Sequence, residues 1–297
     1  MEIDKPKKLK NSISFIMPCF NCSATMDASI MSIINTNFEE GDEIILIDDA
    51  SIDDTYAKAL SYSNRYSFIK VLRHHNNKGT AAAGRNTGID QASSDLIFCL
   101  DSDNILRPNS IRVLKEFLVA NALDAAAFGR IDYFSENSLE VTSSWILTEK
   151  LSFIDALNDP MKTPCGSGNY LYTKALWKKA GRHNEFLGGA YDSELFGLKI
   201  LAEGAKFWTL PETSYLHRNG YESTYMREYS KRNASLLFLA GLIDYWNQVH
   251  EDDVDYIFGK GRLTWMDNIA QKPLRPKSNK KKSIYKRVVK KLKNQLL

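Results

Sequence analysis

Short segments that are apolar at almost every position constrain this chain more than any other feature. Such segments occupy Ile13 to Met17, Glu43 to Ile47 and Leu96 to Leu100, and none has the polar alternation of a half-exposed strand. Helix-compatible patterns follow the first two, over Thr25 to Ile34 and from Ser51 through Leu60. Strands that are buried on both faces and alternate with helices form parallel sheets covered on both sides. The predicted fold class is therefore α/β, with a Rossmann-like, mostly parallel central sheet flanked by helices.

The size and composition of the chain agree with a large packed core. The 297 residues are 43% hydrophobic and 25% charged, which excludes a small stapled scaffold and wholesale disorder. The longest apolar stretch, Leu236 to Ile243, is far shorter than the roughly 18–20 residues that span a bilayer. No apolar segment near Met1 resembles a signal peptide, so the expected location is the cytoplasm.

Positive charge is concentrated at the end of the chain. The net charge is +3, yet residues 271–297 hold eleven lysines and arginines and no acidic residue, which leaves −8 for everything before them. Ile284, Val288, Leu292 and Leu296 recur every four residues among these lysines and predict a basic amphipathic tail. Such a tail suits an anionic membrane surface, which predicts peripheral attachment at the inner face of the cell membrane. A solvated tail without structure is the alternative, and no nucleic-acid motif accompanies the charge.

Polar and acidic residues follow three predicted strands where each ends. They are Pro18, Phe20 and Asn21, then Asp48 and Asp49, then Asp101, Ser102 and Asp103. Ligands of open parallel sheets bind outside the carboxyl ends of the strands. Asp101 and Asp103 can offer hard oxygen ligands to Mg²⁺ or Mn²⁺ together with substrate phosphates, although a solvated turn would have the same pattern. An aspartate after the second strand can accept a hydrogen bond from a nucleobase, and Phe20 can stack on that base.

The four cysteines indicate a reducing compartment. Cys19 and Cys22 form a C-x-x-C that suits a redox pair or half of a zinc site, but Cys99 and Cys165 are isolated and supply no second pair. Ser51 and Asp54 have the spacing of a capping box for the helix that follows.

Four motifs in one order resemble the inverting family-two glycosyltransferases with the GT-A fold, of the non-processive, bacterial surface-glycan type. The matching segments are Ser14 to Asn21, Ile44 to Thr55, Asn77 to Gly79 with Gly84 to Ile89, and Leu100 to Asp103. The likeness covers roughly Ile13 to His217. It implies a nucleotide-sugar-binding half over 13–122 and an acceptor-binding half over 123–219, preceded by a lead at 1–12. A helical extension over 220–270 and the tail at 271–297 would follow.

The resemblance implies a role for each matched residue on the donor side. Pro18, Phe20, Asn21, Asp48 and Asp49 would hold the base and ribose, Arg85 would face the diphosphate, and Ser102 would adjoin the donor. Asp103, with help from Asp101, would coordinate Mn²⁺ or Mg²⁺. Gly84 stands where the family commonly has alanine.

The second half should supply the acceptor side and the catalytic base. The segment from Pro164 to Tyr172 reads as a glycine-rich loop that leads into a strand, and the resemblance would place Gly166, Ser167 and Gly168 of this loop near the acceptor. Asp192 matches the family's catalytic base, and Tyr191 replaces the glutamate that usually precedes it. His217 resembles a histidine that turns back towards the metal. The other histidines, among them His74 and His183, are interpreted as ordinary polar residues.

The resemblance thus implies a metal-dependent hexosyltransferase or N-acetylhexosaminyltransferase. It would move one sugar from a nucleotide-sugar, with UDP favoured, to a hydroxyl of a glycan or lipid-linked acceptor in surface-polysaccharide synthesis. Processive members carry Gln-x-x-Arg-Trp and membrane spans, and neither occurs in this sequence. A sugar-phosphate nucleotidyltransferase and a non-catalytic nucleotide-binding module tethered by the tail are the alternatives. An apolar helical face over Leu236 to Ile243 suits packing on the catalytic lobe or an oligomer.

Overall fold

The computed structural model describes residues 12–135, 138–158, 168–186, 192–219, 241 and 243–249. The predicted tail at 271–297 lies outside the described residues, as do nearly all of the predicted lead at 1–12 and most of the predicted helical extension. The described part of that extension contains the short 3-10 helix η2 (Ile243–Gln248). Within the described ranges, no helix combines the length and apolar character that a bilayer crossing needs.

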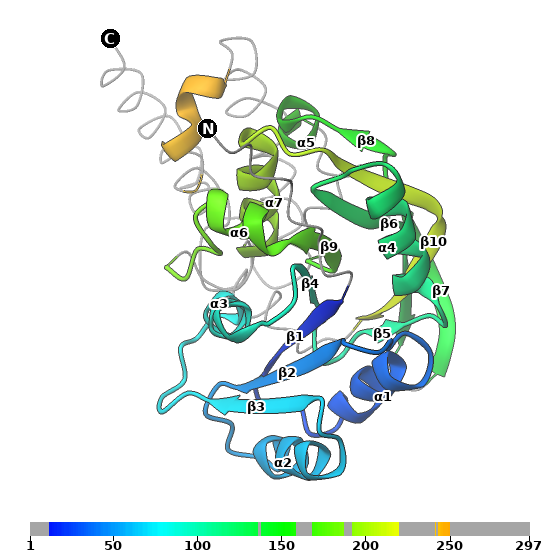
Figure 1. Ribbon diagram of the computed structural model, residues 1–297, viewed down its shortest axis with the longest axis vertical. Coiled ribbons are helices and arrows are strands. Elements are labelled where there is room, and N and C mark those ends of the chain that lie inside the picture. The colour runs from blue at the N-terminus through cyan, green and yellow to red at the C-terminus, as the bar shows by residue number, and fades with distance from the viewer. Residues whose placement is uncertain are drawn as a thin grey trace, which may run out of the picture.

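One sheet runs through the described residues, in the order β3-β2-β1-β4-β9-β6-β10-β5 (Figure 1). Its first four strands are parallel, as predicted: β1 (Ile13–Cys19), β2 (Glu43–Asp48), β3 (Ile69–Arg73) and β4 (Leu96–Cys99). The other half of the sheet is mixed, because β9 (Tyr170–Thr173) runs antiparallel to both β4 and β6 (Ala125–Ser135). The mostly parallel arrangement expected from the sequence therefore applies to the first half of the sheet.

The remaining strands extend the mixed half. The long strand β10 (Phe207–Asn219) pairs in parallel with β6 and antiparallel with β5 (Ile105–Leu106) and β8 (Lys150–Leu151). Strand β7 (Ser138–Ile146) pairs antiparallel with β6. Because β6 and β10 run in the same direction as β4, all three end at the same edge as the parallel strands.

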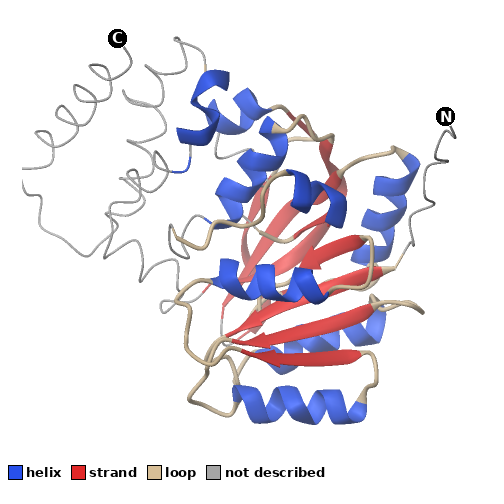
Figure 2. Cartoon of the chain, turned by 60° about the vertical axis from the view of Figure 1, so that its left-hand side comes forward, coloured by secondary structure: helices blue, strands red, loops and turns tan. Residues whose placement is uncertain are grey.

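Helices cover both faces of the sheet (Figure 2). They are α1 (Met26–Thr36), α2 (Thr55–Arg65), α3 (Ala81–Gln91), α4 (Ser110–Ala120), α5 (Phe153–Asn158), α6 (Lys174–Lys179) and α7 (Asp192–Ala202). Successive residues of the strands enter opposite cores, since strand side chains alternate between faces. Ile16 belongs to the core beneath α3 and α7, whereas Phe15 and Met17 belong to the core beneath α1 and α4. Burial on both faces explains why the strand segments are apolar throughout.

The strand register brings the polar strand ends together. Cys19 of β1 lies opposite Asp48 of β2, and the backbone N–H of Asp49 donates to the carbonyl of Cys19 at 2.8 Å. The chain turns sharply after each strand, where Asn21 and Ala50 adopt positive φ angles of 49° and 58°. The predicted convergence of these ends at one edge of the sheet is thus present.

One local prediction fails. The capping box at Ser51 and Asp54 does not form: α2 begins at Thr55, and Asp54 makes no side-chain cap hydrogen bond. The Ser51 amide donates instead to the carboxylate of Asp48 at 3.3 Å, because the turn after β2 is closed by that aspartate.

Close packing of α3 on the sheet depends on Gly88. A Cβ at this position would lie 2.6 Å from Cγ2 of Ile16 and 2.7 Å from Cδ1 of Ile47, both buried. We expect Gly88→Val to lower the free energy of unfolding by about 2–3 kcal/mol, as overpacking of a full core does. Denaturant unfolding would measure this, with Gln91→Val on the exposed side of the same helix as the control. Equal effects of the two substitutions would contradict the prediction.

Candidate active site

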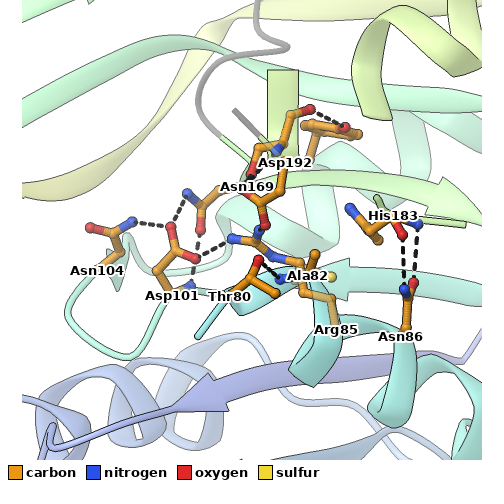
Figure 3. Close-up of polar contacts among 12 residues, drawn as sticks. Thr80, Ala82, Arg85, Asn86, Asp101, Asn104, Asn169, His183 and Asp192 are labelled. Carbon is orange, nitrogen blue, oxygen red and sulfur yellow. Dashed lines mark hydrogen bonds and ion pairs between the residues drawn. The ribbon is translucent and has the colours of Figure 1, made fainter. Parts of the chain in front are cut away.

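A buried arginine stands at the centre of the site. Arg85, on α3, is 3% exposed and donates through Nη2 to Oδ1 of Asp101 at 2.7 Å. Its Nη1 forms a short hydrogen bond and ion pair with Oδ2 of Asp192, the first residue of α7 (Figure 3). Burial opposes its charge, but Asp192 and then Asp101 raise the pKa of Arg85 above its ordinary value. One guanidinium therefore joins the predicted base and the predicted metal-binding turn.

Two asparagines complete the surroundings of Asp101. The side-chain amides of Asn104 and Asn169 each donate to Oδ2 of Asp101 at 3.3 Å, and the Asp101 backbone N–H donates to Oδ1 of Asn169 at 3.3 Å (Figure 3). Asn169 precedes β9, so the turn after β4 is held by the neighbouring strand. Both oxygens of Asp101 thus accept hydrogen bonds from the protein.

Asp103 lies in the same turn but in a different environment. Burial, and then the neighbouring charge of Asp101, raise the pKa of Asp103 to about 6 against the opposing charge of Arg218. The Arg218 guanidinium itself donates through Nε to the Asp103 carbonyl at 3.2 Å. A partly buried carboxylate beside a second carboxylate is stabilised in its charged form by a divalent cation.

His217 approaches this turn from β10. Its Nδ1 lies 3.4 Å from the hydroxyl of Tyr215, which receives a hydrogen bond from Asn169 at 3.3 Å. Burial lowers the pKa of His217, and the neutral imidazole is the form that binds metals. In the part of the chain that the structure describes, no three His, Cys, Asp or Glu side chains are gathered as a metal site. Mg²⁺ and Mn²⁺ nevertheless bind through one or two carboxylates plus substrate phosphates, and these residues fit that need.

Asp192 is almost fully buried at the start of α7. It is 3% exposed, and its Oδ1 accepts from the backbone N–H of Ser193 at 2.8 Å. Burial raises the pKa of Asp192 above its ordinary value, and Arg85 acts in the opposite direction. Both oxygens of Asp192 are thus held in place, and a carboxylate with a raised pKa suits proton transfer.

The aspartates after β2 are each held by a basic side chain. Asp48 forms an ion pair with Nε of Arg73 at 3.0 Å. Asp49 accepts from Nδ1 of His74 at 2.6 Å, and both of its oxygens accept from the backbone N–H of Lys78 at 3.0 Å. His74 also reaches Oγ1 of Thr87 at 2.9 Å. His74 thus links Asp49 to Thr87, a contact that was not predicted from the sequence.

The other predicted donor residues surround the end of β1. Phe20 is 43% exposed, so its ring is accessible to a ligand. Asn21 is part of a rigid turn, where its amide accepts from the backbone N–H of Ile52 and its own N–H donates to Ser51, each at 3.0 Å. Pro18 packs against α3, since a Cβ on Gly84 would lie 2.9 Å from the Pro18 ring. Gly84 thus lies at a close contact between helix α3 and strand β1.

The predicted acceptor residues are only partly described. Gly166, Ser167 and Tyr191 lie outside the described residues. Gly168 has a φ of +68°, and a Cβ there would meet Ser193 Oγ at 2.5 Å and Nη2 of Arg85 at 3.4 Å. The glycine-rich loop therefore ends directly against the residues that hold Asp192.

Sequence patterns missed a second anchor of the site. Asn86, next to Arg85, binds both backbone groups of His183, accepting from its N–H at 3.0 Å and donating to its carbonyl at 2.9 Å (Figure 3). His183 packs on Phe196 of α7 with ring centroids 4.0 Å apart. The position of His183 before α7 in the sequence does not reveal this contact, because Asn86 and His183 are far apart in the sequence.

The cysteines that matched C-x-x-C are free thiols. A hydrogen bond to Cys22 raises the pKa of the buried Cys19 thiol, and the same bond lowers the pKa of Cys22. The pair closes the turn after β1 beside Thr55, whose hydroxyl accepts from the backbone N–H of Cys22 at 2.8 Å.

Comparison with known proteins places these motifs in a family. The model of glycosyl transferase family 2 matches residues 14–178. The UDP-Glc:alpha-D-GlcNAc-diphosphoundecaprenol beta-1,3-glucosyltransferase WfgD of Escherichia coli is 31% identical over 156 residues, which are 52% of this chain and 57% of WfgD. The GalNAc(5)-diNAcBac-PP-undecaprenol beta-1,3-glucosyltransferase of Campylobacter jejuni is 30% identical over 59% of this chain and 56% of its own length. The chain thus spans little more than half of these relatives.

Solved structures share the fold. Staphylococcus aureus TarS 1-349 in complex with UDP-GlcNAc superposes with a TM-score of 0.64 at 19% identity, over 83% of this chain and 70% of that one. The mannosyltransferase PcManGT of Pyrobaculum calidifontis, in complex with GDP-Man and Mn²⁺, has a TM-score of 0.61 at 13% identity, over 90% and 77%. The expected GT-A fold is confirmed. With the family model matching more than half of its length, the chain belongs to glycosyl transferase family 2.

Proposed function

We propose that this protein is a metal-dependent, inverting glycosyltransferase that adds a single sugar from a UDP-sugar to a hydroxyl of a glycan or lipid-linked acceptor. One observation carries the proposal: Arg85 binds the carboxylates of Asp192 and Asp101 at once. The candidate base of the acceptor half therefore lies next to the candidate cation-binding turn of the donor half, as a transfer between two bound substrates requires.

The donor is assigned to the edge where β1, β2 and β4 end. Phe20 offers a partly exposed ring for base stacking, and Asp49, oriented by His74, offers a carboxylate for the base imide. Pro18, Asn21 and Asp48 shape the ribose pocket, and Ser102 adjoins the diphosphate. UDP is favoured because one relative, WfgD, is named for UDP-Glc and a structural neighbour is in complex with UDP-GlcNAc.

Asp103, Asp101 and His217 would hold a divalent cation, Mn²⁺ or Mg²⁺. The neighbour with bound GDP-Man and Mn²⁺ supports this assignment. When bound, the cation would supply charge stabilisation for the departing diphosphate.

Asp192 would act as the general base. Its carboxylate takes the proton of the acceptor hydroxyl while that oxygen bonds to the anomeric carbon, and the bond from this carbon to the diphosphate oxygen breaks with its electron pair leaving on UDP. The single displacement inverts the anomeric configuration. Gly168, with Gly166, Ser167 and Tyr191 of the undescribed segments, is proposed for the acceptor side.

The acceptor class follows from the relatives, two of which are named for undecaprenol-linked substrates. The basic amphipathic tail is proposed to hold the enzyme at an anionic membrane surface, where such acceptors lie. This would make the protein a peripheral enzyme of the inner face of the cell membrane.

The deciding experiment is release of UDP from a panel of UDP-sugars, with Mn²⁺ or Mg²⁺ and with chelator. Release from one donor that depends on the metal and rises on addition of undecaprenol-diphosphate sugars would support the proposal. UDP binding without release from any donor would favour a non-catalytic binding module. Absence of both UDP binding and release would overturn the assignment.

The raised pKa of Asp192 predicts that kcat decreases on the acidic side of its pH profile. A base works only when deprotonated, so kcat should fall as pH drops through this pKa, which burial places above the ordinary range of aspartate. Saturating metal and donor keep Asp103 ionised, which removes its own titration near pH 6 from the profile. The measurement is kcat between about pH 4 and 8. A kcat that stays level down to pH 4 would contradict the prediction.

A further inference from the structure

Arg85 is surrounded by carboxylates, whereas an arginine that binds a phosphate would have its donors free for that phosphate. Its Nη1 faces Asp192 and its Nη2 faces Asp101, so the two ends of the guanidinium fork are directed at carboxylates. The side chain is 4% exposed, and its Nε is buried with no hydrogen-bond partner among the residues that the structure describes. A diphosphate would have to compete with two charged acceptors for this cation.

Without the Arg85 guanidinium, the carboxylates of Asp192 and Asp101 would repel one another. Asp192 and Asp101 both raise the pKa of Arg85 through their charges, and Asp101 raises the pKa of Asp192. Two anions buried near one another repel, and a shared cation removes that repulsion. The fork geometry of arginine allows one side chain to bind both in fixed directions, which a lysine ammonium does not.

Packing fixes the arginine itself. A Cβ on Gly168 would lie 3.4 Å from Nη2 of Arg85, so the loop leaves little free space beside the guanidinium, and Gly84 and Gly88 allow α3 to pack closely on Pro18 and the strands. The next residue, Asn86, holds the backbone of His183 ahead of α7. Helix α3 thus contacts Asp192 through Arg85, and it contacts His183, which precedes α7, through Asn86.

We propose that Arg85 is a positioning residue that sets Asp192 relative to the cation-binding turn by binding both carboxylates, rather than a contact of the donor diphosphate. This inference rests on the proposed function for its consequence in catalysis. It assigns to Arg85 the task of keeping the base ionised and at a fixed place between acceptor and donor.

The test compares Arg85→Lys and Arg85→Gln with Arg182→Gln, which removes an exposed arginine paired with Asp90. We expect both Arg85 variants to bind UDP with Mn²⁺ within about threefold of the wild type, while kcat falls about 100-fold, the scale of a misplaced catalytic group. The Arg182 variant should match the wild type. A UDP affinity at least tenfold weaker, with kcat at saturating donor unchanged, would show a diphosphate contact and overturn the proposal.

A double-mutant cycle with Asp192→Asn adds a readout that a structural role would not move. If Arg85 acts through Asp192, Arg85→Gln should change kcat less than threefold in the Asp192→Asn background. A further 100-fold loss there would overturn the proposal.

The same cycle followed by denaturant unfolding separates this inference from the proposed function. If the wild type transfers no sugar from any donor, the proposed function fails. The unfolding midpoints still test whether Arg85 is coupled to Asp192. Arg85→Gln and Asp192→Asn should then be non-additive, and additive shifts would overturn the inference. If Arg85→Gln does not fold, Arg85→Lys, which retains the charge, takes its place in both cycles.

Discussion

Asp192→Asn is expected to lower kcat by about 10³-fold while the protein still binds UDP. Asparagine has the shape of aspartate and keeps an oxygen for the Ser193 N–H, but it cannot take a proton from an acceptor hydroxyl. General bases contribute roughly 10²–10⁴-fold, which sets this scale. The rate is measured as UDP release with acceptor, and affinity as UDP binding with Mn²⁺.

The control is Asp90→Asn, which alters an exposed carboxylate paired with Arg182. Its kcat should equal that of the wild type. Because Asp192 is buried against Arg85, thermal unfolding must show that the Asp192 variant is folded. A folded Asp192→Asn protein with kcat within tenfold of the wild type would exclude Asp192 as the base.

Asp103→Ala is expected to remove most of the metal dependence and to slow transfer by about 10²–10³-fold, as loss of several kcal/mol of charge stabilisation implies. Asp103 is the partly buried carboxylate of the turn after β4, and its pKa is raised to about 6 by burial and by the charge of Asp101, which a bound cation would offset. The measurement is UDP release against Mn²⁺ concentration, with and without chelator.

The folding control for this variant is its thermal midpoint. Removal of a carboxylate that burial and Asp101 destabilise should leave that midpoint unchanged or slightly higher above pH 6, where the group is charged. An Asp103→Ala enzyme with the metal response of the wild type would move the cation site away from this turn.

The predicted parallel strands show which features of the fold can be predicted from a local pattern of residues. Segments such as that of β2 are apolar throughout because one set of side chains belongs to the core on the side of α3 while the other belongs to the core on the side of α2. Periodicity and burial are local properties of a strand, so they can be predicted from the order of residues. The mixed half of the sheet was not predictable in this way, because the direction of β9 depends on which distant strands flank it.

His74 shows why individual roles were missed. Nothing near it in the sequence distinguishes it from a solvated histidine after a strand, yet it binds Asp49, which is 25 residues earlier. Likewise Asn169, 68 residues after Asp101, holds that carboxylate from the neighbouring strand. Such contacts depend on the pairing of strands that no short pattern encodes.

The sequence by itself determined the α/β class, the edge of the sheet at which the polar strand ends meet and the family to which the chain belongs. These properties follow from alternating apolar segments and from short motifs at the ends of strands. Only the tertiary structure decided what those residues contact. Arg85 and Asp192 are 107 residues apart and meet because α3 and α7 pack on the same face of one sheet. The ionisation and place of a buried carboxylate depend on its neighbours in space, and these are chosen by the packing of the whole domain.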